Sequence, residues 1–253
     1  MEEPIDRSSR PTPPGRESDG PGSGDRPGRW DEPRIDALPA RLINVFISPG
    51  RVMNQIAERP DWMGVLALTT LISAISAAFI PVDLIVETMR QRMIEQGVSV
   101  GDFGEAQRNV LRYGRIPGTI VGTLLLQFGI AALYSVIFIF VLGDEGRYKQ
   151  YLAAVSHGWF IPVLIGVLLL PLVIQTENLE LRLTVDVFIV GFFEPGFVRN
   201  VAKLLDLTVI WSILVIAQGA HAIDRRRSFS SAAAIMLTIF FMYAIGVGLL
   251  QTW

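Results

Sequence analysis

Long stretches without charge alternate with charged segments along the chain. Five runs lack Asp, Glu, Lys and Arg, namely 62–82, 116–143, 150–176, 207–223 and 228–253, with lengths of 21, 28, 27, 17 and 26 residues. A helix of about 20 residues is about 30 Å long and crosses the hydrocarbon core of a bilayer. The run 207–223 reaches that length once Leu204 and Leu205, before Asp206, are included. The pattern predicts an all-α polytopic membrane protein with five transmembrane helices.

The five spans are predicted at residues 62–82, 116–142, 151–174, 204–223 and 229–251. The connection 224–228 is so short that the last two helices must be antiparallel neighbours. The long loop 83–115 is predicted to contain two helical pieces. The apolar piece 184–193 is too short to cross a bilayer, so an interfacial or re-entrant helix is expected there.

The segment ahead of the first span divides into two parts. Residues 1–40 hold eight Pro, five Gly and four Ser, a composition that cannot bury enough apolar surface to offset its ordering entropy. They are predicted to form a disordered tail. Residues 41–60 are amphipathic, with Val52, Met53 and Ile56 on one face of a helix that starts at Pro49. Such a helix is expected at the membrane surface, where Arg51 contacts lipid, and the transmembrane domain follows over 61–253.

Composition narrows the function further. The hydrophobic fraction of 51% fits a membrane protein, and the net charge of −2 gives no support for nucleic-acid binding. The absence of cysteine excludes disulfides and thiolate metal sites. Arginine outnumbers lysine by 20 to 2, which we interpret as the base composition of a bacterial genome. No nucleotide-binding, zinc or nucleophile-elbow motif is present, so neither an enzymatic activity nor a cofactor is expected.

Polar residues inside the predicted spans are the first candidates for function. Gln127 lies near the middle of the second span, and an amide in hydrocarbon needs a partner, so it is expected to face another helix; a substrate role is the alternative. Asp206 opens the fourth span. It is expected to cap that helix or to pair with Arg199 or Lys203, and an ion pathway is the alternative.

The third span carries His157 and Pro162. His157 lies six residues after Tyr151 and therefore near one interface, where a neutral imidazole bonded to a neighbouring helix is expected and a proton relay is the alternative. Pro162 frees the carbonyl oxygen of Gly158, one turn earlier. This span is therefore interpreted as a kinked helix that serves as a packing centre.

Several short motifs resemble those of the Yip1 family of membrane proteins over residues 40–253. The matching residues are Ser48, Pro49, Arg51, Val52 and Pro60 before the first span; Gly143, Gly146, Tyr148, Lys149 and Gln150 before the third; Pro162 within the third; and Leu205, Asp206, Leu207 and Trp211 at the fourth. The resemblance implies five helices, a cytosolic N-terminus and a C-terminus on the opposite side. Eukaryotic members are linked to vesicle trafficking and Rab GTPases, whereas the resemblance implies no catalytic motif.

Charge alone does not decide the orientation. With the N-terminus inside, seven basic residues lie on the inner side and eight on the outer side, so the positive-inside rule gives a tie. The dense Arg225, Arg226 and Arg227 in a tight loop favour a cytoplasmic N-terminus, and the resemblance decides for it. A multi-pass protein of the inner cell membrane is therefore predicted.

The expected function is that of a non-enzymatic integral membrane protein with a role in membrane organisation or trafficking. It would act through helix packing, lipid binding or partner binding, the partners being membrane lipids and a membrane protein or a second copy of the chain. Arg51 and Arg225–Arg227 are the candidates for contact with lipid and for orientation. A passive transporter, a channel or a lipid-moving protein is the alternative.

Overall fold

The computed structural model describes residues 35, 37–95, 97–98, 101, 103–194 and 196–251. Met1–Arg34 and Ile35–Trp253 form separate units, and the helices of the described residues lie in the second unit. The predicted disordered tail, 1–40, lies outside the described residues except for Ile35 and 37–40. The described residues are helical or irregular, with a single isolated bridge between Thr184 and Asp206.

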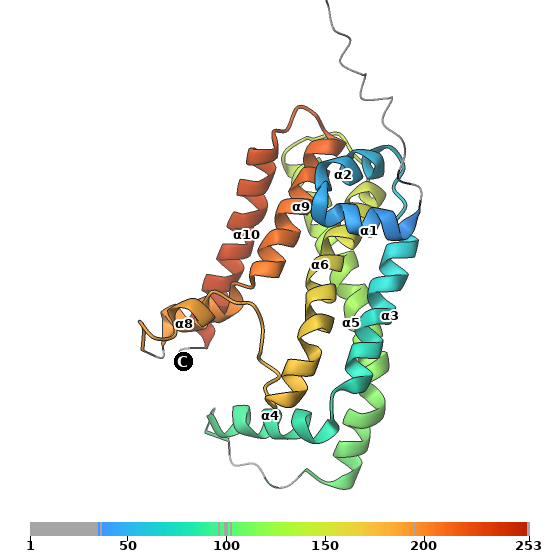
Figure 1. Ribbon diagram of the computed structural model, residues 1–253. Helices are drawn as coiled ribbons and strands as arrows, with labels where there is room; N and C mark the ends of the chain where they lie inside the picture. The colour runs from blue at the N-terminus through green and yellow to red at the C-terminus, as the bar shows by residue number, and fades with distance from the viewer. Residues whose placement is uncertain are drawn as a thin grey trace, which may run out of the picture. The chain divides into compact units, whose positions relative to one another are not determined.

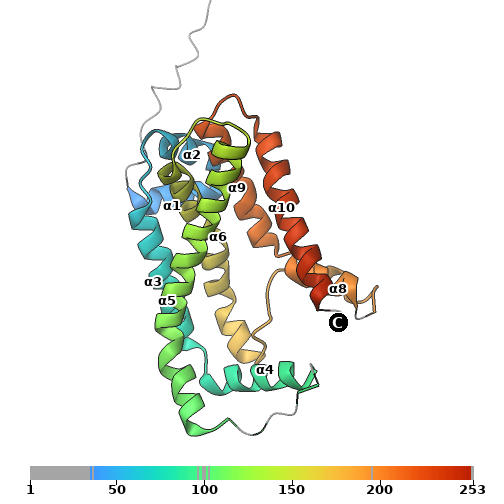
Figure 2. The ribbon, with the colours of Figure 1, turned by 180° about the vertical axis from the view of Figure 1, so that it is seen from behind.

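Five helices run alongside one another in alternating directions (Figures 1 and 2). They are α3 (Met63–Phe79), α5 (Glu105–Ser135) with its π-helical continuation η1 (Val136–Val141), α6 (Tyr148–Gln175), α9 (Leu207–Ile223) and α10 (Phe229–Leu250). Each corresponds to one predicted span, and α5 begins well before residue 116. An all-helical bundle of this kind satisfies its backbone hydrogen bonds internally, as a bilayer requires.

Shorter helices cover the two ends of this bundle. At one end lie α1 (Leu38–Ile47) and α2 (Pro49–Glu58), and toward the other lie α4 (Val82–Glu95) and α8 (Phe197–Leu204) (Figure 1). The short helix α7 (Asp186–Ile189) packs against α8. The helices α4 and α7 fall in the loops where helical pieces were expected. Pro49 occupies the first position of α2, which its fixed φ angle favours.

Three helices are each long and apolar enough to cross a membrane, namely the α5–η1 helix, α6 and α10. The pair α3 and α4, bent by 85°, makes a fourth if it counts as one broken span. The apolar helix α9 has 17 residues and is shorter than a usual span. The structure thus confirms a helical protein with several candidate membrane spans among the described residues, whereas the number five stays a prediction.

The first half of α6 forms the centre of the packed core. All eight residues from Tyr151 to Gly158 are buried, because α6 packs there against several neighbours, which include α3, α5 and α9. Gly158 permits a close approach of α9, since a Cβ atom at this position would lie 2.6 Å from Ile216 Cγ1. The predicted packing centre is therefore this half of the helix, which continues through Pro162 without a break.

The apolar face of α2 has a protein partner. Val52, Met53 and Ile56 are at most 2% exposed, and α2 packs against α9 and α6. A helix that starts at Pro49 was expected and is present, whereas its position at the membrane surface stays a prediction. Periodicity identifies an apolar face and cannot say whether protein or lipid covers it.

Candidate functional site

A charged cluster joins two turns at the end of the bundle that carries α1 and α2. The turn between α9 and α10 contains Asp224, whose carboxylate accepts a hydrogen bond from the backbone N–H of Glu145 at 2.9 Å. Glu145 belongs to the connection between η1 and α6. Gly143 starts that connection with a φ angle of +68°, a left-handed conformation that glycine adopts at little cost.

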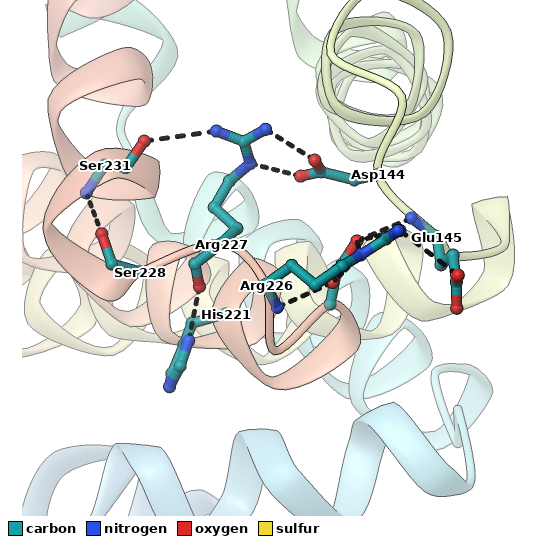
Figure 3. Close-up of polar contacts among 8 residues, drawn as sticks. Asp144, Glu145, His221, Arg226, Arg227, Ser228 and Ser231 are labelled. Atoms are coloured by element: carbon teal, nitrogen blue, oxygen red, sulfur yellow. Dashed lines mark hydrogen bonds and ion pairs between the residues drawn. The ribbon is translucent and has the colours of Figure 1, made fainter.

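Arg227 and Asp144 form a two-pronged ion pair across these turns, and Figure 3 shows the guanidinium between Asp144 and Ser231. The Nη2 atom of Arg227 lies 2.6 Å from Oδ1 of Asp144, and Nε contacts Oδ2. The two side chains are 17% and 7% exposed. The guanidinium also lies 5.6 Å from the ring centroid of Phe138, within the range of a cation–π contact.

The ion pairs determine the charge state of this cluster. Hydrogen bonds from the Arg226 side chain, assisted by backbone N–H groups, hold the pKa of the Asp224 carboxyl well below its usual range. In the opposite direction, the hydrogen bond to Asp144 raises the pKa of the Arg227 guanidinium. Asp224, Arg226 and Arg227 are therefore charged at neutral pH, and the cluster fixes the α9–α10 turn against the η1–α6 turn.

The arginines predicted to meet lipid thus have protein contacts. Arg226 pairs with Asp224 and Glu145, and Arg225 donates to Oδ1 of Asn54 on α2 at 2.6 Å. Arg51 is partly exposed on the same helix. A contact of these cations with lipid headgroups stays a prediction, and the structure adds that Arg225–Arg227 connect three segments of the protein.

Gln127 lies between helices, inside the bundle. It is fully buried, and its Nε2 atom donates to Oγ1 of Thr69 on α3 at 3.1 Å. The hydroxyl of Thr69 in turn lies 3.0 Å from the carbonyl oxygen of Val65. This arrangement is an interhelical hydrogen bond of the kind that an amide in a span requires.

His157 is fully buried, and its ring bonds within α6, where a bond to a neighbouring helix was expected. Nδ1 lies 2.8 Å from the carbonyl oxygen of Ala153, one turn earlier in α6 itself. The ring thus has a partner in its own helix in place of the predicted interhelical one, because it folds back along α6. Nε2 has no hydrogen-bond partner within the described part of the chain.

The two remaining candidates at the start of α9 behave differently. Asp206 caps the helix, with Oδ1 accepting from the backbone N–H of Thr208 at 2.8 Å and from its hydroxyl at 2.6 Å. Arg199 pairs with Asp186 instead. Trp211 does not join the core, since 48% of its surface is exposed.

An apolar cavity of about 750 Å³ lies beside the second half of α6. Side chains of α5, α6, α9 and α10 form its walls, among them Ile130, Trp159, Pro162 and Phe240. Arg182, Lys203 and Asp206 also line it. The bundle is close-packed around the first half of α6 and leaves this space around the second half.

Sequence reasoning missed several of these residues. The pairing of Asp144 with Arg227, the partner Thr69, and the basic lining residues Arg182 and Lys203 were not singled out. The sequence gives little indication of these residues, because charged side chains are common near the ends of membrane spans. Among the described residues, no group of three or more His, Asp and Glu side chains is placed to hold a metal ion.

Comparison with protein families gives one result that covers most of the chain. The family model described as Yip1 domain matches residues 43–250. No curated protein and no solved structure gives a match. The matched region begins within α1 and ends at the last residue of α10.

Proposed function

Because the chain belongs to the Yip1 domain family, a family of non-enzymatic membrane proteins, we propose that it acts by binding a membrane lipid within its helix bundle. The cavity of about 750 Å³ carries this proposal, since ligand sites are typically 300–1,000 Å³ and mostly apolar. The surrounding helices also expose large apolar side chains such as Leu125, Leu168 and Met242. Such surfaces suit contact with acyl chains.

A cavity-filling substitution tests this function. Gly166 lines the cavity, and nothing lies within 4 Å of a Cβ atom built there. Gly166→Phe is therefore expected to place a ring in the cavity and to lower the amount of lipid that co-purifies with the protein in mild detergent. Native mass spectrometry measures the bound lipid directly.

The control variant is Gly129→Phe. Gly129 lies on α5, has equally open surroundings and does not line the cavity. It is expected to retain the lipid content of the unchanged protein. If both variants retain the lipid equally, or if the unchanged protein carries none, lipid binding in this cavity is refuted.

Lipid movement is the second candidate function, which the same cavity favours because it lies alongside apolar, exposed helices. It predicts that purified protein in liposomes accelerates the transfer of a fluorescent lipid between leaflets. The buried Gln127 provides a test of passive flux through the bundle. Flux abolished by Gln127→Leu in a protein of unchanged stability would favour a transport function over simple binding.

The proposal includes a location and an orientation. We place the protein in the inner cell membrane with its N-terminus in the cytoplasm, and we propose membrane lipids and a membrane-protein or homo-oligomeric partner. In that orientation the Asp144–Arg227 pair lies on the cytoplasmic side. Crosslinking in intact membranes, followed by purification under denaturing conditions, identifies a protein partner or a second copy.

A further inference from the structure

We propose that the cavity holds an acyl chain of an anionic glycerophospholipid, whose phosphate is bound by Arg182 and Lys203. This inference rests on the proposed lipid-binding function and adds a headgroup preference to it. The cavity lining contains these two cations and one carboxylate, Asp206. The charged part of the lining therefore has a net positive charge.

Asp206 does not neutralise the two cations. Its Oδ1 atom accepts two hydrogen bonds from Thr208 as the cap of α9. Within the described ranges, neither the Arg182 side chain nor the Lys203 side chain forms a hydrogen bond or an ion pair, and both residues are exposed. Two cations without a carboxylate partner are suited to bind a phosphate group.

Two links hold the segments that carry these cations. The bridge between Thr184 and Asp206 ties the segment after Arg182 to the start of α9, with Leu207 N–H donating to Leu183 O at 2.8 Å. The side chains of Arg199 and Asp186 pair through contacts of 2.9 and 3.1 Å and so tie α8 to α7.

The pairing of Arg199 with Asp186 also leaves the ammonium group of Lys203 available to bind a phosphate. The hydrogen bonds from Arg199 hold the pKa of the Asp186 carboxyl below its usual value, and the nearby charge of Lys203 contributes to this shift. Because Asp186 is already paired with Arg199, it does not occupy the ammonium group of Lys203. A bound phosphate would supply the missing partner.

The apolar wall has the length for an acyl chain. Trp159 and Val173 both line the cavity on α6, and a separation of 14 residues corresponds to about 21 Å of helix. Half of a bilayer's hydrocarbon core is about 15 Å thick. A chain that enters from one leaflet therefore fits along this wall with its headgroup near Arg182 and Lys203.

Quenching of Trp159 fluorescence by brominated lipids tests this assignment. The full-length protein, with its other tryptophans replaced by Phe, is titrated in detergent with phosphatidylglycerol or phosphatidylcholine brominated on the acyl chains. Phosphatidylglycerol is expected to bind more tightly. Arg182→Gln and Lys203→Gln should each weaken its binding about fivefold, and the pair about 25-fold, which corresponds to roughly 1 kcal/mol per cation.

Controls separate headgroup recognition from loss of structure. Arg182→Lys is expected to restore most of the binding, because it keeps the charge. Arg112→Gln removes an exposed cation that does not line the cavity and should leave the affinity unchanged. Native mass spectrometry of the protein with all its tryptophans provides a second measurement if the Trp159-only protein does not fold.

The possible outcomes distinguish the two proposals. Equal binding of both lipids, or no effect of the double substitution, overturns the anionic headgroup and leaves lipid binding intact. Tight binding of a brominated fatty acid, with the same dependence on both cations, overturns the assignment to a glycerophospholipid. If no lipid quenches Trp159 and Gly166→Phe changes nothing, both proposals fail.

Discussion

Arg227 is the residue whose loss is expected to cost the most at the charged end of the bundle. It pairs with Asp144, whose side chain is only 7% exposed. Arg227→Ala would leave a buried carboxylate without its cation, which typically costs about 3 kcal/mol. We expect a markedly lower midpoint of thermal unfolding for the purified protein in detergent, measured by intrinsic fluorescence.

The double variant with Asp144→Ala separates ion pairing from other effects. Removing both partners eliminates the unpaired buried charge, so its cost should be less than the sum of the two single costs. Lys149→Ala, at an exposed cation on the neighbouring turn of α6, should change the midpoint little. Strict additivity would show that the pair contributes no coupling energy.

The pH dependence of stability gives a second prediction at the level of single residues. The Asp224 carboxyl has a lowered pKa in the folded protein, with Arg226 as the first cause. A group of this kind contributes stability above its unfolded pKa of about 3.9 and loses that contribution as the pH falls toward the folded value.

The unchanged protein is therefore expected to be more stable than Asp224→Asn at pH 7. This difference should stay constant down to about pH 5 and shrink below it. Unfolding midpoints of both proteins between pH 3 and pH 7 measure the difference. A difference that grows on acidification would contradict the assigned direction of the pKa shift.

Whether the contacts of a residue can be predicted from the sequence depends on how far along the chain its partner lies. An unpaired amide in hydrocarbon is costly, so the sequence alone was sufficient to predict that Gln127 faces another helix. Its partner, Thr69, was not predictable because 58 residues separate the two. The ring of His157 was misplaced for a related reason, since a carbonyl oxygen of its own helix satisfies Nδ1 as well as a neighbour would.

At the scale of the helices, the contact between α6 and α9 depends on small residues. A Cβ atom at position 158 would lie 2.6 Å from Ile216 Cγ1 and 3.2 Å from the carbonyl oxygen of Ser212. Gly158→Ala is thus expected to push α9 away and to cost about 1–3 kcal/mol. The unfolding midpoint in detergent reports this loss.

Gly166→Ala is the matched change on the same helix. Nothing lies within 4 Å of its added methyl group, and alanine is favoured over glycine inside a helix by up to about 1 kcal/mol. It should be neutral or slightly stabilising. Equal destabilisation by both changes would mean that helix propensity, and not close packing, determines the effect at Gly158.

Charge-free runs predicted the helices well and their surroundings poorly. The start of α6 at Tyr148 and its end at Gln175 lie within three residues of the predicted span. The boundary between α3, which ends at Phe79, and α4, which begins at Val82, also falls near the predicted end of the first span at residue 82. In contrast, the cavity was not predictable, because it results from the different packing of the two halves of α6 and not from any local pattern.

For the molecule as a whole, the positions where the described unit begins and ends give information on the number of membrane crossings. The start of the described unit packs near the charged cluster, since Asn54 on α2 contacts Arg225. Its last helix ends beside α8, where a Cβ atom at Gly248 would lie 2.6 Å from Val201. Helix α10 thus runs away from the end that carries α1 and α2 and ends beside α8 (Figure 1), a direction that agrees with an odd number of crossings.

This arrangement leads to a prediction for reporter fusions. Alkaline phosphatase is active only outside the cytoplasm, so a fusion after Trp253 is expected to be active if five helices cross with the N-terminus inside. Truncated fusions after Glu145 and after Asn178 should be inactive and active, respectively, because they follow two and three crossings. An inactive fusion at Trp253 beside an active one at Asn178 would show that α9 and α10 together cross an odd number of times. Since α9 has 17 residues, that result would identify it as the helix that does not cross.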